Sequence, residues 1–275
     1  MKKLLFIALF VMGISTASAQ FRVYDNDGNV VFEMESSRPA YIEFETPEKI
    51  DTVKYNGTIG DYVDLGLPSG TLWADHNIGA SKPEECGDYY AWAEIETKDL
   101  YDWSTYFDSN EKGSVFYKYK YSSGIKDIEI LEEDDVAFRT WGSEWIMPTY
   151  SHMVELTKQC YWELTESYRE SGVIGYIVYK AKRDEDRGVF ANRGETPLDG
   201  YNVDEDVHIF IPFAGRNRGS EGKNVGVEGF YWCSNLNSGF SLDAKSLLIG
   251  PNGGVSWLID ERYYGQTVRP IRKGQ

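Results

Sequence analysis

The sequence predicts an α+β fold with a largely antiparallel sheet, and three observations lead to that class. Only two segments carry helix signals, residues 132–141 and the stretch that begins at Thr149. Many short β-rich runs follow, with Gly and Asn in the gaps between them. Short helices and strands mixed along one chain are typical of α+β domains. The runs expected as strands after the second helix are 174–179, 188–191, 207–212, 229–234, 246–249, 255–258 and 267–271.

The first helix is predicted from its charge pattern. Acidic residues 132–135 precede Val136 and Ala137, and Gly142 follows Trp141. The helix dipole favours acidic side chains at the N-terminus, and Gly is a common residue just past the end. We therefore expect a short helix that ends at Trp141.

The second helix is predicted from a cap and an apolar stripe. Thr149 is a favourable N-cap residue. Met153, Leu156 and Cys160 lie at i, i+3 and i+7, so they share the face that packs inward. His152 stands where a Glu would complete a capping box, so we expect it to cap the helix or lie on the surface rather than act in catalysis.

Residues 1–19 have the order of a secretory signal peptide. Lys2 and Lys3 precede an apolar run, and Ala17 and Ala19 form an A-x-A cleavage site. We therefore expect the chain to be exported, to the periplasm, the cell surface or the medium. No other run approaches the roughly 18 apolar residues that a membrane span needs, so no span is expected.

The chain is acidic, with 44 Asp and Glu against 28 Lys and Arg and a formal charge of −16. This charge disfavours nucleic acid and anionic lipid as partners, because their phosphates would be repelled. Aromatic residues make up 15% of the chain, which excludes a disordered acidic tail. The composition therefore indicates a folded protein and disfavours nucleic acid and anionic lipid as its partners.

The first mature stretch, residues 20–55, is expected to form a small β segment. The runs 21–24 and 30–34 flank Asp27-Gly28, and Asp-Gly between β-rich runs is a strong hairpin signal. Two further strands are expected, at 41–45 and 50–55.

Few residues are candidates for catalysis or metal binding. Cys86, Cys160 and Cys233 allow at most one disulfide bond, and their spacing fits no zinc motif. Cys160 and Cys233 fall on apolar faces and are expected in the core, whereas Cys86 lies in a loop and is the thiol expected to be accessible. A pair of carboxylates brought together by the fold is the other catalytic candidate, whereas most adjacent acids such as Asp260-Glu261 are expected on solvated faces. No cofactor or metal site is predicted, although loop carboxylates leave a structural calcium ion as an alternative.

Two late loops, residues 214–219 and 260–265, combine Arg, Asn and Tyr with Gly. Flat rings beside amide and guanidinium donors suit sugar faces and peptide surfaces. We expect these loops and one Trp of a neighbouring strand to form a ligand-binding face. Its predicted members are Arg216, Asn217, Arg218, Trp257, Arg262, Tyr263 and Tyr264.

Several motifs together resemble one bacterial surface-protein family. Residues 62–74 read YVDLGLPSGTLWA, residues 87–94 read GDYYAWAE and residues 141–149 read WGSEWIMPT. As a set they are similar to the Fibrobacter succinogenes major paralogous domain, over residues 56–275. The later parts of the same pattern are residues 210–215, 229–234 and 268–272.

The resemblance implies a C-type-lectin-like fold, the branch that also contains the formylglycine-generating enzymes. This fold has two helices beside small antiparallel sheets, and here the segment 20–55 precedes it. The Glu-Pro-Asn and Trp-Asn-Asp motifs of calcium-dependent sugar-binding lectins are absent from this chain, and the formylglycine-generating cysteine pair has no counterpart near its C-terminus. The resemblance therefore implies neither catalysis nor lectin-type calcium binding.

These features predict an exported, non-catalytic binding module that recognises a glycan or an extracellular protein. Two alternatives stay open. One is a structural subunit of a surface assembly, and the other is an enzyme that uses Cys86 or a carboxylate pair.

Overall fold

A computed structural model describes residues 19–24, 30–36, 59–121 and 128–272. The chain divides into two compact units, Met1–Asp51 and Thr52–Gln275. The predicted signal peptide up to residue 18 and the strands expected at 41–45 and 50–55 lie outside the described residues.

The first unit contains an antiparallel hairpin. Strand β1 (Ala19–Tyr24) pairs with β2 (Val30–Ser36), with Phe21 opposite Met34. The predicted hairpin is confirmed, and β1 begins at Ala19, the last residue of the predicted signal peptide.

The first and last strands described in the second unit belong to the same sheet. This sheet has the order β3 (Tyr62–Val63), β4 (Leu72–Ala74), β15 (Ile271–Arg272) and β5 (Trp145–Ile146). All of its pairings are antiparallel, and β15, the last strand of the described residues, lies between β4 and β5. Strand β15 is shorter than the predicted 267–271 run, because residues 267–270 make isolated contacts to several segments instead.

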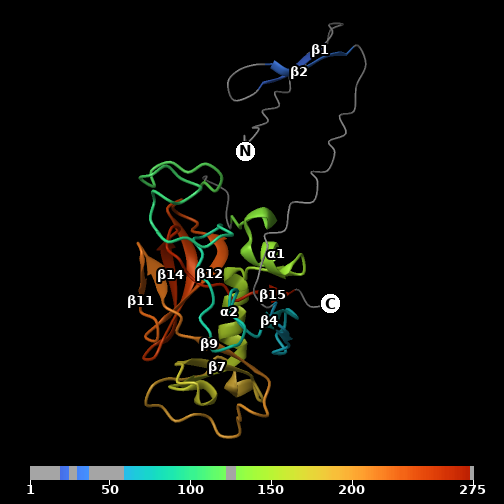
Figure 1. Ribbon diagram of the computed structural model, residues 1–275. Coiled ribbons are helices and arrows are strands. Elements are labelled where there is room, and N and C mark those ends of the chain that lie inside the picture. The colour runs from blue at the N-terminus through green and yellow to red at the C-terminus, as the bar shows by residue number, and fades with distance from the viewer. Residues whose placement is uncertain (1–18, 25–29, 37–58, 122–127, 273–275) are drawn as a thin grey trace. The chain divides into compact units, whose positions relative to one another are not determined.

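A second sheet has the order β8, β6, β7, β9, and a third is the meander β12, β13, β14. Apart from the parallel pair β6 and β8, their strands are antiparallel. Their bounds are β6 (Cys160–Thr165), β7 (Gly175–Lys180), β8 (Phe190–Ala191), β9 (His208–Pro212), β12 (Gly229–Leu236), β13 (Asp243–Gly250) and β14 (Gly254–Glu261). The predicted α+β class, with mostly small antiparallel sheets, is confirmed (Figure 1).

Helix α1 (Val136–Trp141) follows a 3-10 turn, η1 (Glu132–Asp134), and ends at Gly142 as predicted. Asp135 is its N-cap, and the side chain accepts hydrogen bonds from the backbone N–H groups of Ala137 and Phe138. Two further 3-10 turns are η2 (Tyr168–Glu170) and η3 (Asp184–Asp186).

Helix α2 (Tyr150–Gln159) begins after Thr149, as predicted. His152 completes a capping box with Thr149: the hydroxyl of Thr149 accepts from the backbone N–H of His152, and Nδ1 of His152 accepts from the backbone N–H of Thr149 at 3.1 Å. The helix ends before Cys160, which starts β6 and is fully buried. The expectation that Cys160 lies on the helix is therefore wrong, although its burial is as expected.

Two tryptophan side chains connect the segment of residues 90–92 to strand β12 through buried hydrogen bonds. Trp92 Nε1 donates to the carbonyl of Cys233 at 2.9 Å, and Trp232 Nε1 donates to the carbonyl of Tyr90 at 2.8 Å. Helix α2 packs against β6, β12 and β13 (Figure 1). It is the longest helix of the described residues at 10 residues, and none of the helices described has the length and apolar character of a membrane span.

Candidate functional site

The site is built around a short hairpin of β10 (Arg216–Arg218) and β11 (Glu221–Lys223). Its two-residue loop begins with Gly219, whose φ of +65° is typical of tight hairpin turns. Backbone hydrogen bonds hold β10 from two other segments. Asn217 and Gly265 exchange bonds of 2.7 and 3.0 Å, and Gly219 and Tyr101 exchange bonds of 2.9 and 2.8 Å. The backbone on either side of Arg218 is therefore fixed.

Arg216 is held in place by the sheet below the hairpin. Its Nη1 donates to both carboxylate oxygens of Asp260 on β14, at 2.9 and 2.8 Å. The guanidinium also lies 4.3 Å from the ring centroid of Phe230 and 4.8 Å from that of Tyr264. Ion pairing and cation–π contact together fix its position, so Arg216 supports the site.

Arg218, two residues along the same strand, is exposed. Its guanidinium lies 5.4 Å from the ring centroid of Tyr264. Tyr264 and the hydroxyl of Tyr263 raise the pKa of Arg218, so the side chain is a permanent cation. Because residues two apart on a strand point to the same face, Arg216 and Arg218 lie side by side over Tyr264.

Tyr263 and Tyr264 form an aromatic floor that is mostly buried, and burial raises the pKa of both phenols. Their rings meet edge to face with centroids 4.7 Å apart, and the Tyr263 ring meets Trp103 at 4.8 Å. The Tyr263 hydroxyl donates to Oε2 of Glu261 at 2.8 Å. The structure therefore brings five of the predicted residues together: Arg216, Asn217, Arg218, Tyr263 and Tyr264.

Trp257 does not belong to this group. It lies opposite Leu247 in the β13–β14 register, and its ring packs on Tyr150 of α2 with centroids 4.6 Å apart. Asp260, which binds Arg216, is three residues further along the same regular strand. Since side chains alternate between the two faces of a strand, Trp257 faces away from Arg216. The expectation that Trp257 and Arg216 share one ligand-binding face is therefore wrong.

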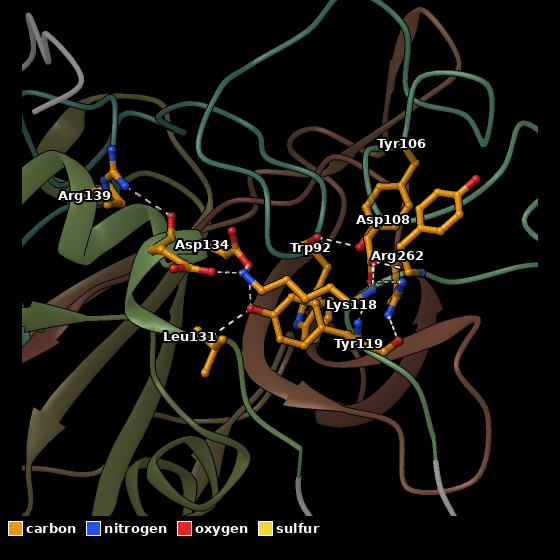
Figure 2. Close-up of polar contacts among 11 residues, drawn as sticks. Trp92, Tyr106, Asp108, Lys118, Tyr119, Leu131, Asp134, Arg139 and Arg262 are labelled. Carbon is orange, nitrogen blue, oxygen red and sulfur yellow. Dashed lines mark hydrogen bonds and ion pairs between the residues drawn. The ribbon is translucent and has the colours of Figure 1, made fainter. Parts of the chain in front are cut away.

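Arg262 lies inside the domain and not on the expected surface. Its side chain is fully buried, and Nη2 donates to Oδ2 of Asp108 at 2.9 Å (Figure 2). Nη1 donates to the carbonyl of Tyr119 at 2.9 Å. The rings of Trp92 and Phe116 lie 5.3 and 4.3 Å from the guanidinium. Arg262 therefore holds the long excursion after residue 97 against the domain and contributes no exposed donor.

Asp108 organises that excursion. Its carboxylate accepts hydrogen bonds from the backbone N–H groups of Tyr117 at 3.1 Å, of Tyr119 at 2.9 Å and of Lys118. Lys118 also contacts the carboxylate of Asp134, and Tyr119 donates its hydroxyl to the same carboxylate at 2.5 Å (Figure 2). No sequence signal marks Asp108, because its partners are backbone groups of an irregular segment and one distant arginine.

The three cysteines are free thiols. Cys160 and Cys233 are fully buried, and burial raises the pKa of each to about 12. Cys86, expected to be accessible, is only partly exposed, and burial raises its pKa as well. A thiol with a raised pKa carries little thiolate at neutral pH, so it is a weak nucleophile.

The described residues hold no group of three or more His, Cys, Asp or Glu side chains placed to bind a metal ion. Comparison of the chain with protein-family models, with curated proteins and with solved structures found no match. The function proposed for this chain therefore rests on the geometry of the site.

Proposed function

We propose that this protein is an exported, non-catalytic binding module of C-type-lectin-like fold that recognises a glycan or an extracellular protein. The proposed ligand surface consists of Arg218, Tyr263, Tyr264 and Glu261, with Arg216 and Asn217 as its support. The signal-peptide pattern of residues 1–19 is the basis for export.

The proposed fold and family rest on topology as well as on motifs. Strand β4, near the start of the domain, pairs with β15, the last strand of the described residues. The motif of residues 141–149 runs from the last residue of α1 through β5 to the cap of α2, so it covers a compact structural corner. Both features agree with the resemblance to the Fibrobacter succinogenes major paralogous domain.

One observation carries the functional proposal: an exposed arginine stands over a tyrosine ring on a backbone that is hydrogen-bonded on both sides. Arg218 occupies this position between Asn217 and Gly219. A preorganised side chain loses little conformational entropy when it binds, and Arg and Tyr are enriched among the residues that dominate binding energies. Binding residues are commonly carried by loops on such a rigid scaffold.

A glycan and protein array probed with the purified protein tests the proposal. Arg218→Ala is expected to lose at least tenfold in affinity for the ligands that the wild type binds, which is the loss expected for a hot-spot residue. The matched control is Arg187→Ala, because Arg187 is also exposed and lies on another part of the surface. Equal binding by both variants and the wild type would place the ligand site elsewhere.

A second candidate function is a structural subunit of a surface assembly, and the edge strand β14 favours it. Within the described residues, β14 pairs only with β13. Trp257 and Ile259 on this strand are 37% and 56% exposed. An exposed apolar edge strand is a template for pairing with another chain. Sedimentation at increasing concentration tests this candidate: Ile259→Lys should abolish any assembly, and a monomer at every concentration rules the candidate out.

A further inference from the structure

Arg218 differs from the other arginines of residues 128–272 in that it has neither an acidic side chain nor a backbone carbonyl as a hydrogen-bonded or ion-pair partner. Ten arginines lie between residues 128 and 272, and the nine others besides Arg218 have an acidic side chain or a backbone carbonyl as a partner. The pairs with acids are Arg169–Asp204, Arg183–Asp186, Arg187–Asp184, Arg193–Glu166, Arg216–Asp260, Arg262–Asp108 and Arg272–Glu144. Arg139 and Arg269 donate to backbone carbonyls. Within the described residues, Arg218 has no ion pair, and the Tyr263 hydroxyl is its polar neighbour.

The acids that flank Arg218 are engaged elsewhere. Glu221 is its register partner across the hairpin, but that carboxylate pairs with Lys223. Glu261 accepts the hydroxyl of Tyr263. In a chain with 44 acidic and 28 basic residues, an exposed arginine without a carboxylate partner is unexpected from composition. The hairpin thus presents a cation that forms no ion pair, with the carboxylate of Glu261 close enough to raise its pKa.

The surroundings of this cation define the ligand chemistry. A guanidinium presents parallel N–H donors that match a carboxylate in a bidentate arrangement. The carboxylate of Glu261 nearby is an acceptor and binds only groups that donate, such as hydroxyls. An acidic peptide would bring several carboxylates close to Glu221 and Glu261 and to a chain of charge −16. A sugar with one carboxylate among several hydroxyls satisfies both the donor and the acceptor.

We propose that Arg218 anchors the carboxylate of an acidic saccharide, with Glu261 and the Tyr263 hydroxyl placed to bind hydroxyl groups of the same sugar. This inference rests on the proposed binding function and narrows its ligand to a chemical class. The anchoring contact is a charge-assisted hydrogen-bond pair, which contributes most when the arginine is already held in position.

The test compares each acidic saccharide with its uncharged counterpart. Galacturonic acid is titrated against galactose, and sialyllactose against its carboxyl-reduced form, by calorimetry with the full chain. The wild type should bind the acidic member of at least one pair about tenfold more tightly or better, the range of a hydrogen bond to a charged group. The ratio of the two affinities should fall to about one in Arg218→Gln. It should be partly retained in Arg218→Lys, which keeps the charge but lacks the parallel N–H donors of the guanidinium.

Controls and outcomes separate this inference from the broader proposal. Arg187→Gln should keep the wild-type ratio, and an unchanged melting temperature in Arg218→Gln shows that the exposed substitution leaves the fold intact. Equal affinity for acidic and neutral sugars overturns the carboxylate inference while leaving a glycan-binding function. Binding of acidic peptides in place of saccharides, lost in Arg218→Gln, also overturns it. Absence of binding to every saccharide and protein overturns both proposals.

Discussion

Arg262 and Asp108 form an ion pair in which both side chains are fully buried, with Nη2 and Oδ2 2.9 Å apart. The two residues are 154 positions apart in the sequence. Their contact fixes the irregular segment around residues 108–119 against the start of the loop that carries Tyr263 and Tyr264. The positions of Tyr263 and Tyr264 therefore depend on a buried ion pair formed by the residue that directly precedes them in the sequence.

Removal of one partner of this pair should be strongly destabilising. Asp108→Ala leaves a buried guanidinium without its counter-charge, so the free energy of unfolding should fall by about 3–5 kcal/mol. Glu166→Ala is the matched control, because the Arg193–Glu166 pair is exposed and should contribute at most about 1 kcal/mol. Urea denaturation measures both. A loss in Asp108→Ala no larger than in the control would show that the buried pair does not hold the segment.

The carboxyl group of Asp135 should make stability depend on pH. Burial raises its pKa to about 6, although backbone N–H groups of Ala137, Phe138 and Met147 act in the opposite direction. Its unfolded pKa is near 3.8, so the folded state binds the proton more tightly. The contribution of this group to the free energy of unfolding is therefore fully present below about pH 4 and is lost as pH rises through about 6.

A comparison of variants isolates this effect from other titrations. The difference in unfolding free energy between wild type and Asp135→Asn should shrink by roughly 3 kcal/mol between about pH 4 and pH 7. Ser151→Ala is the control, because that exposed hydroxyl does not titrate, and its curve should run parallel to the wild type. Parallel curves for Asp135→Asn as well would contradict a raised pKa.

The capping box of α2 predicts an unusual tolerance at position 152. Thr149→Ala should lower the free energy of unfolding by about 1 kcal/mol, because it removes the N-cap acceptor. His152→Glu should keep or raise stability, since Glu makes the same reciprocal bond and favours the positive end of the helix dipole. His152→Ala should be less stable than either Glu or His. Thermal melts of these variants, beside the exposed Lys158→Ala, decide the order.

Thiol labelling tests the predicted state of the cysteines. In unfolded protein without reductant, three thiols per chain should react, since all three are free. In the folded protein at about pH 8, Cys86 should react first but more slowly than a free cysteine, whose pKa is about 8.5. Cys86→Ser should remove that first phase. Fewer than three thiols after unfolding, or Cys86 labelling as fast as free cysteine, would contradict the structure.

Local signals in the sequence were sufficient for several elements. Thr149 at the start of α2, Gly142 after α1 and Asp27-Gly28 in the first hairpin each predict their element through backbone preferences of a few residues. Strand β6 was missed because Cys160 follows α2 without any turn residue, so the apolar stripe of the helix runs directly into the strand.

The candidate site was predicted in part, for reasons that depend on register and distance. The sequence predicts that Arg218 groups with Tyr263 and Tyr264, because the loops 214–219 and 260–265 have similar compositions. To predict that Trp257 lies apart from the other site residues, one must know which face of β14 each side chain points to, and the β13–β14 register sets this. The burial of Arg262 runs against the rule that arginines lie at the surface, and its partner Asp108 lies in an aperiodic segment.

The most direct test of the account is a calorimetric titration of the best array ligand into wild type, Arg218→Ala and Arg187→Ala. The account predicts that Arg187→Ala matches the wild type and that Arg218→Ala weakens binding at least tenfold. An Arg218→Ala variant that folds and binds with the wild-type affinity would contradict it.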